Sequence, residues 1–158
     1  MGTHESLTFD VTIRSPRERV WAVMLGPETY REWTAPFFAG SYYEGAWSEG
    51  SRIRFLTPSG EGMVAEVAVC RPPELVSLRH IGRIHGGIED TESAGVRSWA
   101  PAFETYALVA VPEGTRVEVR QDAVPAFASS LEAAWPAALD VLRRLCETPA
   151  SSRPAEGP

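Results

Sequence analysis

A long amphipathic stretch near the C-terminus places the strongest constraint on the fold. Residues 129–147, SSLEAAWPAALDVLRRLCE, repeat apolar side chains every three or four positions, which predicts a helix of more than about four turns. The apolar stripe consists of Leu131, Ala134, Trp135, Ala138, Leu142 and Leu145. A helix cannot bury such a stripe alone, so the rest of the chain must supply a surface that covers it. Ser129 and Glu132 predict a capping box at the start, and Pro136 predicts a bend.

The preceding residues carry strand patterns. In LTFDVTI, residues 7–13, apolar and polar side chains alternate, as in a strand with one buried face. From about residue 38 to 121, short β-rich runs separated by turn residues predict a meander of about six strands. The runs are RIRFL, MVAEVAVC, ELVSLRH, FETYALVAV and TRVEVRQ, and TPSGEG and PEGT supply hairpin turns. The strands therefore form the surface that covers the long helix.

Two short helices and one long loop complete the expected order. Ser15, Pro16 and Glu18 in SPRE match a capping box with proline in the first turn, so a helix should begin there. A second short helix is expected near residues 27–33. Residues 81–101 hold four glycines and several acidic residues, which predicts a long loop that either binds something or is disordered.

Together these elements predict one α+β domain over residues 7–147. A curved antiparallel sheet of about six or seven strands would wrap around the long C-terminal helix, with the two short helices after the first strand. This arrangement leaves a pocket beneath the short helices. A length of 158 residues suits one hydrophobic core, and the tail, residues 148–158, is rich in Pro and Ser and is expected to be disordered.

Composition excludes several classes of function. A net charge of −6 argues against nucleic acid as a partner, because phosphate binding needs a basic surface. No run approaches the roughly 18 apolar residues of a membrane span, so we expect no membrane association and a cytoplasmic protein. Cys70 and Cys146 lack the paired spacing of a zinc site and are expected to be reduced thiols in the core. We expect no cofactor.

The order of elements and several stretches resemble the activator-of-heat-shock-protein-90-ATPase homologue (AHSA-type) family. This family belongs to the SRPBCC superfamily of START-like, Bet v 1-like domains with a helix-grip fold. The resemblance covers roughly residues 8–147. The stretches that carry it are SPRERVWAVMLGPETYREW, WSEGSRIRF, GMVAEVAVCRPPELVSLRH, EGTRVEV and the terminal helix. None is a catalytic signature, so the case depends on their order.

The resemblance implies a cavity between sheet and C-terminal helix, which members of the superfamily use to bind lipids, hormones, polyketides or other apolar molecules. It also implies two alternative functions: an enzyme of the polyketide-cyclase or aromatase kind, and a module that interacts with a chaperone in the stress response or forms a homodimer. Eukaryotic members carry a further N-terminal domain for much of the chaperone contact. Nothing before residue 7 could be such a domain, which argues against a chaperone partner.

Strand periodicity predicts a polar cluster facing this cavity. In ELVSLRH, His80 ends the strand on the same face as Val76 and Leu78. In FETYALVAV, the family pattern favours Glu104 and Tyr106 on the inner face, although the opposite phase stays open. If the strands are neighbours, the three polar residues meet as a structural hydrogen-bonded group, a ligand-orienting group or an acid/base pair. We expect the structural role and assign no catalytic residue.

Other polar residues give weaker signals. His85, Glu89 and Asp90 could be metal ligands, but their Gly-rich segment lacks a recognised ligand spacing, so we expect a solvated loop and no metal. Arg52 and Arg54 share one strand face and are expected to be exposed, with anion binding as a minor alternative.

The leading hypothesis is non-catalytic binding of a small hydrophobic or aromatic molecule, gated by residues 81–101 and the short helices. Aromatic side chains suit a packed core as well as a binding site, and each Trp or Tyr needs a partner for its polar atom. The candidate ligand-binding residues are Trp33, Phe38, Tyr43, Phe55, Met63, Leu78, His80, Trp99, Glu104, Tyr106, Phe127, Leu131 and Trp135.

Overall fold

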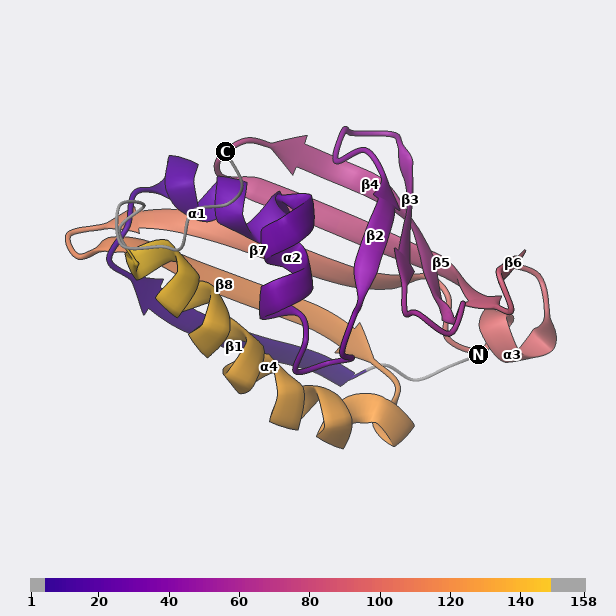
Figure 1. Cartoon of the computed structure of the whole chain (residues 1–158). Coiled ribbons are helices and arrows are strands. Elements are labelled where there is room, and N and C mark those ends of the chain that lie inside the picture. Colours follow the sequence, from indigo (N-terminus) through magenta and orange to yellow (C-terminus); the bar gives the residue numbers. More distant parts are fainter. Residues whose placement is uncertain (1–4, 149–158) are drawn as a thin grey trace.

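A curved antiparallel sheet with helices packed on one face forms the framework of the protein (Figure 1). The computed structural model describes residues 5–148. The strands are β1 (Glu5–Ile13), β2 (Tyr42–Gly45), β3 (Arg52–Leu56), β4 (Gly62–Arg71), β5 (Leu75–His85), β6 (Ile88–Asp90), β7 (Ala102–Val111) and β8 (Gly114–Ala123). The helices are α1 (Arg17–Leu25), α2 (Pro27–Trp33), α3 (Ala94–Arg97) and α4 (Pro125–Glu147). The predicted α+β helix-grip architecture is confirmed.

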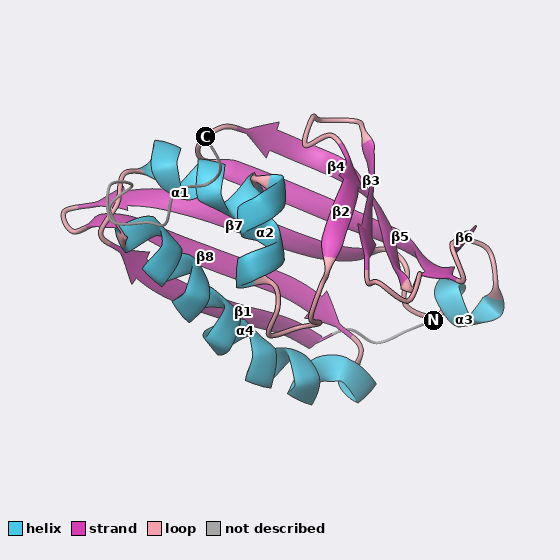
Figure 2. Cartoon of the chain, viewed as in Figure 1, coloured by secondary structure: helices cyan, strands magenta, loops and turns pink. Residues whose placement is uncertain are grey.

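The first strand of the chain, β1, pairs with the last strand, β8. The strand order of the sheet is β1-β8-β7-β5-β4-β3-β2, with the short β6 paired to β5, and all pairs are antiparallel (Figure 2). Register shifts interrupt the β4–β5 pair at Val64/Ala65 and at Val67/Val69. Such bulges bend and twist a strand, which helps the sheet to curve around a helix.

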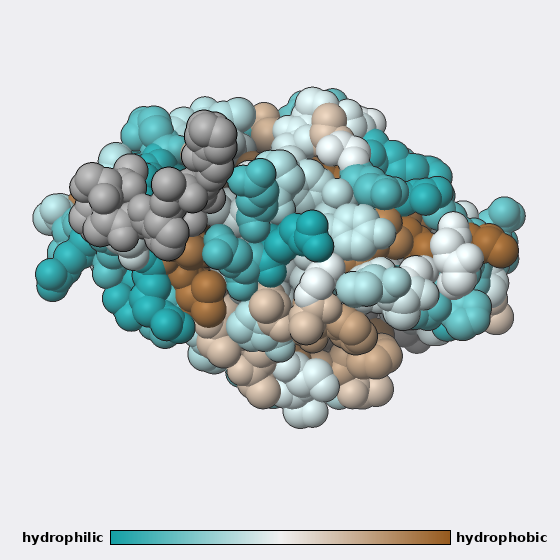
Figure 3. Space-filling model, viewed as in Figure 1, coloured by the Kyte–Doolittle hydropathy of each residue, from teal (hydrophilic) through white to brown (hydrophobic). Residues whose placement is uncertain are grey.

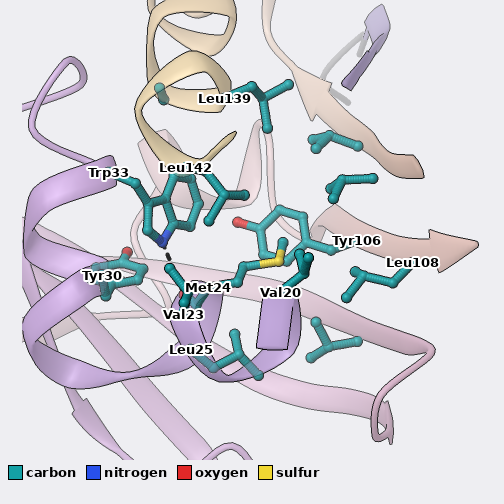
Figure 4. Close-up of a cluster of buried hydrophobic side chains, with 14 of the residues drawn as sticks. Val20, Val23, Met24, Leu25, Tyr30, Trp33, Tyr106, Leu108, Leu139 and Leu142 are labelled. Carbon is teal, nitrogen blue, oxygen red and sulfur yellow. Dashed lines mark hydrogen bonds between the residues drawn. The ribbon is translucent and has the colours of Figure 1, made fainter. Parts of the chain in front are cut away.

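The concave side of the sheet is covered by three helices. α4 packs against β1, and α1 and α2 both pack against α4. Trp33 from α2 and Trp135 from α4 are each 1% exposed, and their ring centroids lie 5.9 Å apart. The indole N–H of Trp33 donates to the Met24 carbonyl over 2.9 Å, which satisfies its polar atom within the core (Figure 4). The core thus fixes α2 against α4.

Both predicted capping boxes are wrong. α1 follows Pro16, which makes no side-chain cap, and the Ser15 hydroxyl is buried without a partner among the described residues. α4 begins at Pro125, before Ser129, because proline already has the φ angle of a first helical residue. α4 continues through Pro136 to Glu147.

The predicted long loop at residues 81–101 is largely regular structure. His80 does not end its strand, because β5 continues to His85 and turns back into β6. Gly86 and Gly87 both have positive φ, so these glycines serve a tight turn. α3 follows, capped by the Ser93 hydroxyl, which accepts from the amide of Val96 over 3.3 Å. The expected disordered tail lies outside the described residues, apart from residue 148.

Within residues 5–148, none of the helices is both long and apolar enough to span a bilayer.

Candidate functional site

A cavity of about 870 Å³ lies between the sheet, α2 and the first half of α4. Its volume falls in the usual range for small-molecule sites. Phe38 and Phe127 line it while remaining 54% and 62% exposed, which places them at its rim. Apolar residues gather on the surface over the first half of α4 (Figure 3). The exposed lining residues Phe38 and Phe127 thus bring the cavity wall to the surface.

Most of the predicted ligand-binding residues line this cavity. They are Trp33, Phe38, Phe55, Met63, His80, Trp99, Glu104, Tyr106, Phe127, Leu131 and Trp135. Two predicted residues do not. Leu78 is 1% exposed in the core, and Tyr43 packs edge-on against Tyr30, with its hydroxyl donating to the Leu25 carbonyl over 2.5 Å. The inward face of a strand thus contains both core and cavity positions, which periodicity does not separate.

Sequence reasoning missed several lining residues, notably Tyr30 and Gln121. Gln121 continues the inward phase of Val117 and Val119 on β8, so strand alternation would have placed it on the cavity side. Tyr30 lies in α2, and a helix of seven residues gives little periodicity to analyse.

The predicted polar cluster forms inside the cavity. β5 and β7 are neighbours, and His80, Glu104 and Tyr106 all project from the inner face. His80 Nε2 lies 2.9 Å from Glu104 Oε1, and the Tyr106 hydroxyl donates to Glu104 Oε2. The side chains of His80 and Glu104 are only 8% and 13% exposed. Two protein groups therefore hold the Glu104 carboxyl group at the inner end of the cavity.

The charge on Glu104 affects the tyrosines around it. Burial, followed by repulsion from Glu104, raises the pKa of Tyr106 well above its ordinary value. The same two causes raise the pKa of Tyr30. Both hydroxyl groups consequently keep their protons at neutral pH and can act as hydrogen-bond donors.

A second hydrogen bond fixes a polar group beside Glu104. The Trp135 indole N–H donates to Gln121 Oε1 over 2.7 Å. Gln121 lies directly opposite Glu104 in the β7–β8 pair, so their side chains share the cavity face. The amide of Gln121 is thus part of the same polar end of the cavity.

The residues considered as metal ligands are engaged elsewhere. His85 Nδ1 lies 2.9 Å from Glu61 Oε1, and Glu89 pairs with Arg54 over 2.6 Å and with Arg52 over 3.0 Å. Asp90 accepts the backbone N–H of Ser93, and hydrogen bonds from the Ser93 side chain and then from this N–H lower the pKa of Asp90. Residues 5–148 contain no group of three or more His, Cys, Asp or Glu side chains arranged to hold a metal ion.

The family model described as Activator of Hsp90 ATPase homolog 1-like protein matches residues 14–147. The chain belongs to this family. The matched segment runs from the end of β1 to the end of α4, so the family domain contains the whole cavity. No protein with a curated description matches the sequence.

Solved structures share this family's fold at low sequence identity. Protein MLL2253 from Mesorhizobium loti is 17% identical, with a TM-score of 0.69 over 89% of this chain and 96% of that one. A protein described as the Aha1 dimer from Colwellia psychrerythraea is 18% identical, with a TM-score of 0.69 over 90% and 96%. DynU16, described as belonging to the dynemicin biosynthetic locus, is 20% identical, with a TM-score of 0.65 over 90% and 47%. These similarities establish the fold.

Proposed function

We propose that this protein binds a small hydrophobic, largely aromatic molecule in its cavity without converting it. The observation that carries the proposal is the cavity of about 870 Å³, whose wall is rich in aromatic side chains and which also holds a few fixed polar groups. Apolar walls remove a ligand from water, and a small number of polar groups fix its orientation.

Phe38 and Phe127 line the cavity and have exposed rings, so they form part of its rim. Arg83 and Trp99, from the segment that the glycines predict to be a loop, also line the cavity. β6 of this segment is tied to β3 through Glu89 and the two arginines of that strand. Opening would therefore involve movement of an anchored hairpin together with the rim, not of a free loop.

Titration with the neutral fluorescent probe N-phenyl-1-naphthylamine tests this function. We expect saturable binding at one site, with increased fluorescence as the probe leaves water. Half-saturation should occur at micromolar probe concentration, equivalent to about 8 kcal/mol of binding free energy. Absence of binding up to about 1 mM, or about 4 kcal/mol, for this and other apolar probes would contradict the proposal.

A second candidate is an enzyme of the polyketide-cyclase or aromatase kind. The favouring observation is the contact between His80 Nε2 and Glu104 inside the cavity, because a paired imidazole can transfer protons. Similarity to DynU16, whose description places it in a biosynthetic locus, points in the same direction. The test is turnover of aromatic polyketide substrates. His80→Ala should abolish turnover while the circular dichroism spectrum stays unchanged.

A further inference from the structure

The side-chain amide of Gln121 has a hydrogen-bond partner for its oxygen but none for its NH₂ group among the described residues. An indole N–H is only a donor, so the atom of Gln121 that faces Trp135 must be the amide oxygen. The orientation of the amide is thereby fixed, and its NH₂ group occupies the other branch. Gln121 lines the cavity, and the structure of residues 5–148 records no hydrogen bond from its Nε2.

The carboxylate and amide oxygens at this end of the cavity are already in use, whereas His80 Nδ1 is buried without a partner among the described residues. One oxygen of Glu104 faces His80 Nε2, and the other accepts the hydroxyl of Tyr106. The oxygen of Gln121 accepts from Trp135. The NH₂ group of Gln121 thus remains a free donor beside oxygens that already accept from protein groups. A ligand that buries this NH₂ group without accepting a hydrogen bond from it would incur the cost of an unpaired polar group.

Charges around the cavity disfavour an anion. The acidic side chains that line it are Glu104 and Asp122, against one arginine, Arg83, which lies 3.8 Å from Asp90. Glu104 is directly opposite Gln121 across the β7–β8 pair. A carboxylate or phosphate accepting from Gln121 would therefore lie next to a like charge in a poorly solvated site.

We propose that Gln121 is a specificity residue whose amide N–H binds a neutral acceptor oxygen, such as the carbonyl of an aromatic ketone. This inference rests on the proposed binding function and names the chemical class of its ligand: a neutral, planar aromatic molecule that carries a carbonyl group. The ring system contacts the aromatic wall, and the oxygen points toward β8.

Three probes of matched shape test the inference: 9-fluorenone, fluorene and fluorene-9-carboxylate. Each displaces N-phenyl-1-naphthylamine from the intact chain, and the inhibition constants are compared. Fluorenone should bind about threefold to tenfold more tightly than fluorene, the difference expected for one neutral hydrogen bond. The carboxylate should bind more weakly than fluorenone.

Gln121→Met removes the amide donor, keeps the length of the side chain and leaves a thioether as a weak acceptor for Trp135. In this variant fluorenone and fluorene should bind equally, because the donor that distinguishes them is gone. The matched control is Arg120→Met on the outer face of β8, where Arg120 contacts Ser6. This control should retain the wild-type preference.

Each outcome has a distinct meaning. Equal binding of fluorenone and fluorene to the wild-type protein, or an unchanged preference in Gln121→Met, overturns the role of Gln121 and leaves the binding function intact. Tighter binding of the carboxylate than of the ketone overturns the neutral class. If none of the three displaces bound N-phenyl-1-naphthylamine, the aromatic-ketone class is overturned while the binding function stands. If N-phenyl-1-naphthylamine itself does not bind, the proposed function fails, and this inference fails with it.

Discussion

Glu104 satisfies two buried donors, and its removal tests the polar network at the level of one residue. Glu104→Leu leaves His80 Nε2 and the Tyr106 hydroxyl without their shared acceptor. The free energy of unfolding should fall by about 2 kcal/mol, since each buried unsatisfied group costs about 1–3 kcal/mol and the added apolar surface offsets part of it. Urea denaturation followed by circular dichroism measures the change.

The control is Glu118→Leu on the neighbouring strand β8. Glu118 is half exposed and lies 3.2 Å from Arg116 on the outer face, where an ion pair contributes less than about 1 kcal/mol. An equal loss of stability in both variants would show that the cluster of Glu104 has no special energetic role.

The raised pKa of the Cys146 thiol should make the free energy of unfolding depend on pH at alkaline pH. Burial raises the pKa of this thiol to about 12, from about 9 in an unfolded chain. Above pH 9 the unfolded chain loses the proton while the folded chain keeps it, so the thiol lowers stability as pH rises toward 12.

Cys146→Ala removes this titration. Between about pH 9 and pH 11, the free energy of unfolding of the wild-type protein should therefore fall by about 2 kcal/mol more than that of the variant. Urea denaturation at both pH values measures the difference. Cys70→Ala is the control, because Cys70 is less buried and the upward shift of its pKa is smaller. Parallel pH curves for wild type and Cys146→Ala would contradict the prediction.

At the scale of elements, Arg19 links α1 to the end of α4. Its Nε donates to the Cys146 carbonyl over 2.7 Å, and Nη2 donates to those of Leu145 and Thr148 over 3.3 and 2.7 Å. A cation there satisfies carbonyls that the helix leaves free and interacts favourably with the helix dipole. Arg19→Met should lower the free energy of unfolding by about 1.5–3 kcal/mol, as expected for charged hydrogen bonds.

Arg17→Met, on the same helix, is the matched control. Arg17 forms one 3.4 Å ion pair with the exposed Glu74, so its loss should cost less than about 0.5 kcal/mol. Chemical denaturation of the two variants should separate them clearly. Equal midpoints would mean that α1 does not hold the end of α4 through Arg19.

The hairpin of β5 and β6 supplies a second element-scale prediction. Glu89 bonds both Arg52 and Arg54 of β3 and thus anchors β6 to the sheet. Glu89→Ala should increase hydrogen–deuterium exchange in residues 86–99 at least about threefold, with little change in β7 and β8. Glu92→Ala in the same segment is the control. The same exchange in wild type and Glu89→Ala would exclude this anchor as a restraint on opening.

The same hairpin shows how far sequence reasoning reaches. Alternating residues place His80 on the inner face correctly, because a strand repeats every two residues. The glycines suggest a loop, whereas Gly86 and Gly87 make one turn and β5 extends past Gly82. Glycine composition indicates where a chain can turn, but the length of each flanking strand depends on pairing with β4 and β6, which periodicity within one segment does not reveal.

For the whole molecule, the order of elements and the long apolar helix predict the α+β fold, because few arrangements bury such a helix with a meander. The cavity boundary could not be predicted. Leu78 and Tyr43 share the chemistry of lining residues, yet Leu78 lies in the core and Tyr43 packs against the core, outside the cavity wall. The expectations of a homodimer and of no chaperone partner stay predictions.

If ligands bind in the cavity between the sheet and α4, a side chain that fills this cavity should abolish binding without unfolding the chain. This prediction concerns the molecule as a whole. Ala134 on α4 lines the cavity and is partly buried. In Ala134→Trp, an indole enters the space that a ligand would occupy. N-phenyl-1-naphthylamine affinity should fall at least about tenfold, equivalent to about 1.4 kcal/mol. The thermal midpoint should stay within a few degrees, because the cavity can accept the added ring without displacing packed atoms.

Ala126→Trp is the matched control for this substitution. Ala126 is exposed on the same helix and does not line the cavity, so its replacement adds the same ring outside. Probe affinity should remain within about twofold of the wild-type value. If Ala134→Trp binds as well as Ala126→Trp, the probe occupies another surface, and the cavity between sheet and α4 is not the binding site. A loss of affinity confined to Ala134→Trp, with both variants folded, locates binding between the sheet and α4, where the polar end at Glu104 and Gln121 can select the ligand.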